Sequence, residues 1–181
     1  MKNIIRLIFV CSILFLSIFS NIAKASNVVD DAIVDVTGYK FSTKLKPSRI
    51  ISLNTSIDEI LLDLVSSDRV LAICTSSADP TMSSVVDKAE KITVKLPLRS
   101  SCEVILGLQP DLVLFPEGGP REMVDSLRDL GIKVYVVRSA TSIKAIKEKI
   151  KEVSLVVGES EKGKVLLKNM DDKLQEVQHF I

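Results

Sequence analysis

Residues 49–61 read RIISLNTSIDEIL and predict the first strand and helix of an α/β domain. Residues 49–53 form a short apolar run rich in β-branched side chains, which is typical of a strand buried on both faces. A polar loop follows. Ser56, with Glu59 three residues later, then predicts a capping box that opens a helix. This order of strand, polar loop and capped helix indicates a βα unit.

The same pattern repeats along the chain. Further apolar strands are expected at residues 70–74, 111–115 and 134–137, separated by segments with helical spacing. One such helix is expected over residues 120–130 and ends at Gly131. Alternating βα units imply an α/β fold in which helices flank a parallel sheet. In such sheets, ligands meet the loops at the carboxyl ends of the strands.

The segments on either side of this domain have different patterns. Residues 32–44 alternate around Thr37-Gly38 and predict a hairpin, so residues 26–46 are expected to precede a main lobe at 47–158.

Two amphipathic helices are expected in the last third of the chain. Apolar residues recur at spacings of three and four from Ile143 to Val157, and again from Leu167 to Ile181. The second helix has only a narrow apolar stripe. It is either a frayed terminal helix or a helix that normally packs on a partner lobe.

The first 25 residues are typical of a secretory signal peptide. Lys2 and Arg6 precede an uncharged, largely apolar run over residues 7–19, and Ala23-Lys24-Ala25 suits a signal peptidase. The run is shorter than the roughly 20 residues that a membrane-spanning helix needs, which disfavours an uncleaved anchor. We therefore expect cleavage after Ala25 and a soluble, periplasmic mature chain.

Composition excludes several classes of protein. Lys and Arg total 24 against 23 Asp and Glu, so no basic surface for nucleic acid is expected. The one histidine, His179, cannot build a multi-histidine metal site or a Ser-His-Asp triad, and we expect neither a metal site nor catalytic residues. Cys74 and Cys102 could form one disulfide or stay as two thiols.

Three blocks of sequence, in order, resemble one known family. They are RIISLNTSIDEIL at residues 49–61, DRVLA at 68–72 and EVILGLQPDLVL at 103–114, and LRDLGIKVYVV at 127–137 fits the same pattern. Together they are similar to the N-terminal lobe of the cobalamin, hemin and siderophore binding proteins of ABC importers. The resemblance covers residues 28–180 and includes no second lobe.

The resemblance implies the substrate-binding component of an ABC importer, with no cofactor of its own. Its transported ligand would be hemin, cobalamin or a ferric siderophore, and its partner an ABC permease in the inner membrane. Residues 159–181 would begin the helix that connects two lobes, so the chain would be truncated. In the family, a Glu at the tip of this lobe pairs with permease arginines, and here that residue is Glu103. A Glu that simply favours the start of a helix is the alternative.

The same resemblance implies ligand contacts from the loops at one edge of the sheet. These would be Asn54, Thr55, Ser76, Ser77, Arg99, Glu117, Gly118 and Gly119. Asn54 and Thr55 also fit an ordinary helix cap, and residues 117–119 a plain turn. Residues 95–98, KLPL, depart from the family pattern and supply no Tyr or His to a hemin iron, which leaves Met82, Cys74 and Cys102 as candidate ligands.

Two other functions stay open. A small secreted α/β enzyme could use the loops at Asn54 or Glu117, but His179 lies on the terminal helix, away from any nucleophile there. A one-lobed adaptor could contact a permease through Glu103 without binding a ligand. Turnover would identify the enzyme, and permease binding without ligand would identify the adaptor.

Overall fold

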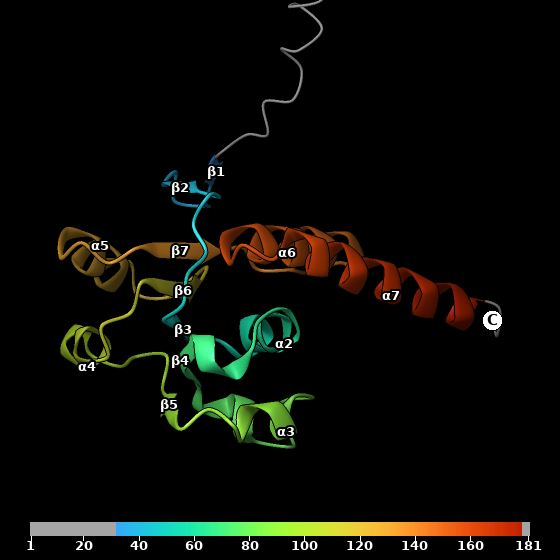
Figure 1. The fold of residues 1–181 in the computed structure, drawn as a ribbon, viewed down its shortest axis with the longest axis horizontal. Helices are drawn as coiled ribbons and strands as arrows, with labels where there is room; N and C mark the ends of the chain where they lie inside the picture. The colour runs from blue at the N-terminus through green and yellow to red at the C-terminus, as the bar shows by residue number, and fades with distance from the viewer. Residues whose placement is uncertain (1–31, 179–181) are drawn as a thin grey trace, which may run out of the picture. The chain divides into compact units, whose positions relative to one another are not determined.

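Five parallel strands form the central sheet, in the order β5-β4-β3-β6-β7 (Figure 1). The computed structural model describes residues 32–178, so the predicted signal peptide and His179 lie outside the described residues. The strands are β3 (Ile50–Ser52), β4 (Val70–Cys74), β5 (Val94–Leu96), β6 (Leu112–Pro116) and β7 (Val134–Val137).

All four expected strands are present, and the parallel α/β sheet is confirmed. The sequence does not predict β5, because it has only three residues and two of them are half-buried. A run this short carries no apolar pattern that distinguishes it from a loop.

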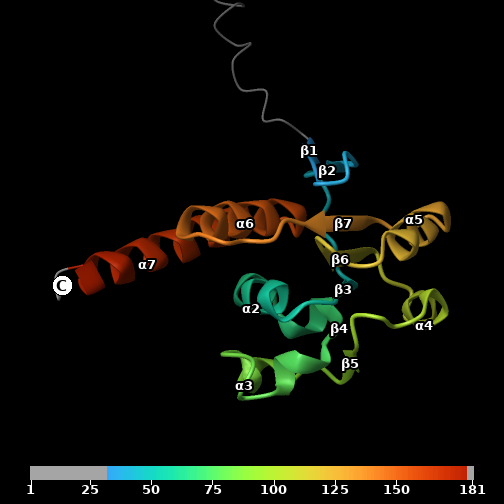
Figure 2. The same ribbon diagram turned by 180° about the vertical axis from the view of Figure 1, so that it is seen from behind.

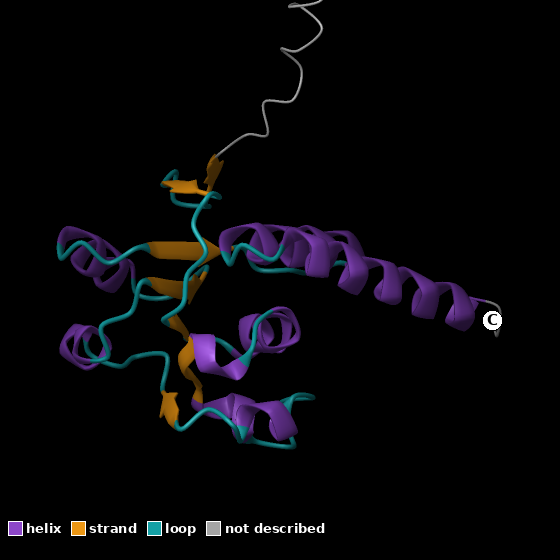
Figure 3. Ribbon diagram, in the orientation of Figure 1, coloured by secondary structure: helices purple, strands orange, loops and turns teal. Residues whose placement is uncertain are grey.

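Helices cover both faces of the sheet (Figure 3). Figures 1 and 2 show α2, α3 and α6 on one face, α4 and α5 on the other, and α7 running beside α6 and past its end. The helices are α2 (Thr55–Leu64), α3 (Val86–Ala89), α4 (Cys102–Gly107), α5 (Arg121–Asp129), α6 (Ile143–Val156) and α7 (Ser160–Gln178), with short 3-10 turns η1 (Ser67–Arg69) and η2 (Thr75–Ala78).

The hydrophobic core has one layer on each face of the sheet. Ile50 packs with α2 and α6, whereas Ile51 packs with α4 and α5, and both side chains are fully buried. Successive residues of a strand point to opposite faces, so a two-sided apolar strand needs helices on both.

The cap of α2 differs from the prediction. Asn54, not Ser56, is the N-cap, and its Oδ1 accepts from the Ser56 N–H at 3.1 Å and the Ser56 hydroxyl at 2.7 Å. The Glu59 carboxylate accepts instead from Ser84, so the predicted capping box is wrong. The extended backbone of Asn54, with φ −154°, suits an N-cap, and its side chain reaches the first turn before Ser56 can.

The family-like blocks at 49–61 and 103–114 are held together by one carboxylate. Asp111 accepts from the backbone N–H groups of Ser48 and Arg49 at 2.8 and 2.9 Å. The Arg49 guanidinium returns bonds to the carbonyl oxygens of Gln109 and Leu108 at 2.7 and 2.6 Å. These contacts align the starts of β3 and β6, which pair directly in the sheet.

The expected hairpin forms from β1 (Ala32–Val34) and β2 (Lys40–Ser42). It is joined to the main sheet through Asp35, which pairs with Arg128 at 2.6 Å and accepts from the Val136 N–H at 3.0 Å. Burial alone would raise the pKa of Asp35, but hydrogen bonds from Thr37, Val136 and Tyr39 outweigh it and lower that pKa. The carboxylate is thereby kept ionised, so it continues to hold hairpin and sheet together.

The junction between α6 and α7 is also fixed. Arg69 donates to the carbonyl oxygen of Val157 at 2.6 Å and pairs with Glu159 at 2.5 Å. Between these two residues, Gly158 has a φ of +72°, and a Cβ there would lie 3.0 Å from the Leu45 carbonyl oxygen. The direction in which α7 leaves the sheet is therefore set by backbone geometry and by a half-buried ion pair.

Asp58 is a fully buried carboxylate on α2. It accepts from the Cys74 N–H at 2.8 Å and the Ser77 hydroxyl at 2.5 Å, which ties η2 to the helix. Burial raises the pKa of Asp58 to about 7 from its ordinary 3.8, although the hydrogen bonds from Ser77 and Cys74 act in the opposite direction.

We predict that Asp58 makes the fold less stable as pH rises. Between about pH 4 and about pH 7 the unfolded chain releases this proton while the folded chain keeps it, so the free energy of unfolding falls across that window and levels off above it. D58N should remove this part of the pH dependence. Urea unfolding at about pH 5 and about pH 8 measures it, with D87N at an exposed carboxylate as the control. Parallel pH profiles for wild type and D58N would contradict the prediction.

Candidate ligand-binding site

The strand order reverses between β3 and β6, and a cavity lies at the carboxyl ends of β3, β6 and β7. Open parallel sheets bind their ligands at such switch points. The cavity has a volume of about 390 Å³. It is lined by Asn54, Ser56, Glu59, Ile60, Pro116, Glu117, Val137, Arg138, Ser139, Ala140, Ile146 and Lys149.

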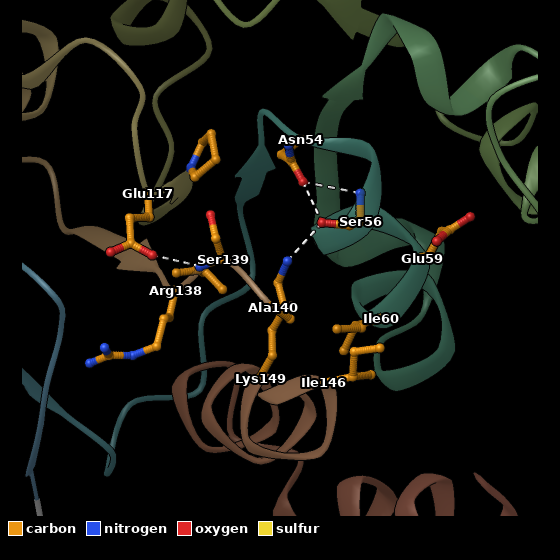
Figure 4. A pocket seen from close by; sticks show the side chains of 12 residues that line it. Asn54, Ser56, Glu59, Ile60, Glu117, Arg138, Ser139, Ala140, Ile146 and Lys149 are labelled. Atoms are coloured by element: carbon orange, nitrogen blue, oxygen red, sulfur yellow. Dashed lines mark hydrogen bonds between the residues drawn. The ribbon is translucent and has the colours of Figure 1, made fainter. Parts of the chain in front are cut away.

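A chain of hydrogen bonds crosses the cavity wall from α6 to α2 (Figure 4). The Lys149 amino group donates to Ser56 Oγ at 2.7 Å, and the Ser56 hydroxyl donates to Asn54 Oδ1 at 2.7 Å. Lys149 is only 6% exposed. Its desolvation lowers the pKa of the amine, while the carboxylates of Glu152 and Glu59 act in the opposite direction.

Glu117 links two loops on the other side of the cavity. Its Oε2 accepts from the Ser139 backbone N–H at 2.8 Å, which joins the loop after β6 to the loop after β7. Arg138 also contributes to this wall. The wall therefore combines fixed hydrogen-bonding groups with the apolar side chains of Ile60 and Ile146, a mixture common in small-molecule sites.

Two of the expected ligand contacts, Asn54 and Glu117, line this cavity. Gly118 and Gly119 lie beside it and, with Glu117, line a second hollow of about 280 Å³. Packing explains this glycine pair: Gly118 has a φ of +82°, and a Cβ on Gly119 would lie 2.2 Å from the Phe115 ring.

The remaining expected contacts lie elsewhere. Thr55 begins α2, Ser76 is half-buried in η2, and Arg99 is exposed in the loop before α4. Ser77 is fully buried, with its hydroxyl committed to Asp58. A ligand at the edge of the sheet has no access to Ser77, so we leave it out of the proposed site.

Sequence reasoning missed Lys149, Ser139 and Arg138. A signal for Lys149 exists, because it lies three residues after Ile146 and four before Val153, on the apolar side of α6. A lysine in that register is expected to be buried or functional. Ser139 and Arg138 follow β7 in a loop without a motif, and only the sheet order brings them to Asn54.

The candidate iron ligands are not grouped. Cys74 is buried and Cys102 half-buried, both as free thiols, and Met82 is 61% exposed. Within residues 32–178, no cluster of three or more His, Cys, Asp or Glu side chains could hold a metal ion. Within the same range, no helix has both the length and the apolar character needed to span a bilayer.

The fold defines one α/β lobe with a cavity at the switch point of its sheet. The family model of periplasmic binding proteins matches residues 50–180, so this chain belongs to that family. The family resemblance of its sequence blocks is confirmed.

Several known proteins are similar to this chain over part of their length. A cobalamin-binding protein of Halobacterium salinarum is 26% identical over 140 residues, covering 77% of this chain and 37% of the relative. A possible iron-binding (periplasmic solute-binding) protein from Staphylococcus epidermidis superposes with a TM-score of 0.64 at 24% identity, over 74% of this chain and 51% of that one. A periplasmic heme-binding protein from Roseiflexus gives a TM-score of 0.60 at 26% identity, over 71% and 48%. The chain thus spans between 37% and 51% of the length of these relatives.

We predict that Asn54 stabilises the cavity wall as the cap of α2. N54A should lower the free energy of unfolding by about 1 kcal/mol, because the first turn loses its side-chain acceptor. N54D keeps the acceptor oxygen and should retain most of the stability. Chemical denaturation measures both variants. Equal losses in N54A and N54D would show that the cap is not the source of the effect.

Proposed function

We propose that this chain is a ligand-binding lobe of the substrate-binding protein of an ABC importer for hemin, cobalamin or a ferric siderophore. In this role it performs no chemistry and works in the periplasm, after removal of residues 1–25. One observation carries the proposal: a member of the periplasmic binding protein family places a mixed polar and apolar cavity at the switch point of its sheet.

The cavity supports one half of a ligand site. Small-molecule sites bury some 70–90% of their ligand, and about 390 Å³ in one wall is too little to enclose a porphyrin or a corrin. The chain covers about half the length of each of these two solved relatives. A site that a second lobe completes is consistent with this coverage. In this proposal α7 is the helix between the lobes. Its exposed Val165 and Val177 are apolar surface of the kind that a second lobe covers.

Glu103 supports the proposed contact with an ABC permease. It is exposed in the first turn of α4, on the far side of the sheet from α2. A hydrogen bond from Ser101 holds the pKa of Glu103 below its usual range, so its negative charge persists in mildly acidic surroundings. A single exposed pair contributes little affinity, but it can set docking register and association rate.

An enzyme is the competing proposal, and one contact favours it. Ser56 and Lys149 lie 2.7 Å apart, as in serine–lysine catalytic pairs. The hydrogen bonds run the wrong way for that chemistry, however. Lys149 donates to Ser56, and the Ser56 proton points to Asn54, so the lysine is not placed to accept it. We therefore favour binding over turnover.

We predict that the purified chain from Ser26 binds hemin, cobalamin or a ferric siderophore saturably, but far more weakly than a two-lobed relative such as the Roseiflexus heme-binding protein. One open wall loses the enclosure on which tight capture depends, and its exposed apolar surface favours self-association. Absorbance titration and light scattering test the two parts. A monodisperse monomer that binds one ligand tightly would overturn the half-site proposal, and no binding of any of the three would overturn the function.

We also predict that E103K slows association with the permease and reduces its salt dependence, while ligand titration stays unchanged. E122K is the matched control, because Glu122 is an exposed acid in the first turn of α5 and carries the same helix-terminus effect. Binding to the permease in nanodiscs, measured at two salt concentrations, gives the result. If E122K slows association with the permease as much as E103K does, Glu103 has no specific docking role and only favours the start of α4.

A further inference from the structure

Lys149 is a buried amine with no carboxylate partner. It is 6% exposed, and in the part of the chain that the structure describes no carboxylate oxygen lies within the 4.0 Å limit for an ion pair with it. Its one hydrogen bond goes to Ser56 Oγ. An ammonium group has three donors, so two of them have no protein acceptor among the described residues.

Other lysines of α6 do not share this arrangement. Lys147 pairs with Asp171, and Lys144 pairs with Glu148 on the solvent side. Lys149 alone among them lines the cavity. A buried cation without an anion is costly, and proteins keep such groups where something else supplies the counter-charge.

The acids that face the cavity are committed elsewhere. Glu59 accepts from the Ser84 N–H and hydroxyl, both at 2.9 Å, and Glu117 accepts from the Ser139 N–H. Figure 4 shows these two carboxylates on opposite sides of the cavity, with the Lys149 side chain rising between them toward Ser56. Glu152 and Glu59 act on the Lys149 amine only at longer range, because among the described residues no carboxylate oxygen lies within ion-pair distance of it.

The start of α2 adds to the same field. This ten-residue helix begins at Thr55, and Ser56 in its first turn lines the cavity. The N-terminus of a helix carries partial positive charge, which favours an anion next to it. The Lys149 amine on α6 and the N-terminus of α2 lie at the same wall of the cavity. Both attract an entering anion, so their electrostatic effects add.

We propose that Lys149 selects ligands that carry a carboxylate, which binds in this cavity between its amino group and the N-terminus of α2. The proposal rests on the proposed function and narrows its ligand class. Hemin has two propionate groups at one edge, whereas the side chains of cobalamin are amides and a bridging phosphodiester. A propionate edge also fits a cavity of about 390 Å³ that cannot hold a whole porphyrin.

The central test compares hemin with hemin dimethyl ester, which has the same ring without its negative charges. The wild-type chain should bind the acid at least about tenfold more tightly than the ester, as expected for a charge-assisted contact. K149M should bring this ratio to about one. K149R should restore it, because the positive charge at this position attracts the propionate groups. K151M, at an exposed position of the same helix, should leave the ratio unchanged.

The outcomes separate the two proposals. Equal binding of acid and ester by the wild type overturns the role of Lys149 and leaves the proposed function in place. Acid selectivity that survives in K149M also overturns it. The proposed function itself is overturned if the chain binds none of hemin, hemin dimethyl ester, cobalamin and ferric siderophores.

A measurement without any chelate tests Lys149 independently. Millimolar propionate, compared with chloride at equal ionic strength, should raise the unfolding midpoint of the wild type but not of K149M. Without propionate, K149M should unfold at the same temperature or higher, since it loses an unpaired buried charge. An equal effect of propionate on both proteins overturns the proposal. K149Q replaces K149M if that variant does not fold.

Discussion

The parallel pairing of β3 with β4 on one side and β6 on the other is the constraint on which the rest of the structure depends. It buries β3 on both faces, so Ile50 and Ile51 each require a helical layer. It also places the two chain reversals that follow β3 and β6 next to each other. The cavity exists because these two loops diverge at the switch point, with α2 entering one layer and α5 the other.

The buried polar groups inside this framework are of two kinds. Asp35 and Asp111 are carboxylates that accept several N–H groups each, and they join segments that are distant in sequence. Asp58 and Lys149 differ, because each is buried and, among the described residues, neither has an opposite charge within ion-pair distance. Asp58 can become neutral in the interior, whereas Lys149 borders open space where a ligand can supply the missing charge. This contrast is the reason for proposing a recognition role for Lys149 and none for Asp58.

The connection between α6 and α7 bears on how a lobe of this kind would move. Gly158, Arg69 and Glu159 fix the direction of α7, and Gly163 lies against Ser154, where a Cβ would meet the serine oxygen at 2.3 Å. In a two-lobed protein such a junction favours small changes of angle over large hinge motions.

The sequence by itself determined the α/β class, four of the strands and the two final helices, because buried parallel strands are continuous apolar runs and amphipathic helices repeat at 3.6 residues. It also pointed to Asn54 and Glu117, since polar residues after such strands lie at one edge of the sheet. Tertiary structure alone decided that Asn54 caps α2, that Ser77 lies in the core and that Lys149 faces the cavity. The burial of Ser77 and the position of Lys149 at the cavity depend on contacts across 16 or more positions, and the cap depends on a choice between two residues two positions apart. The helical register of Lys149 indicates a buried lysine, but no local pattern shows which residues it faces.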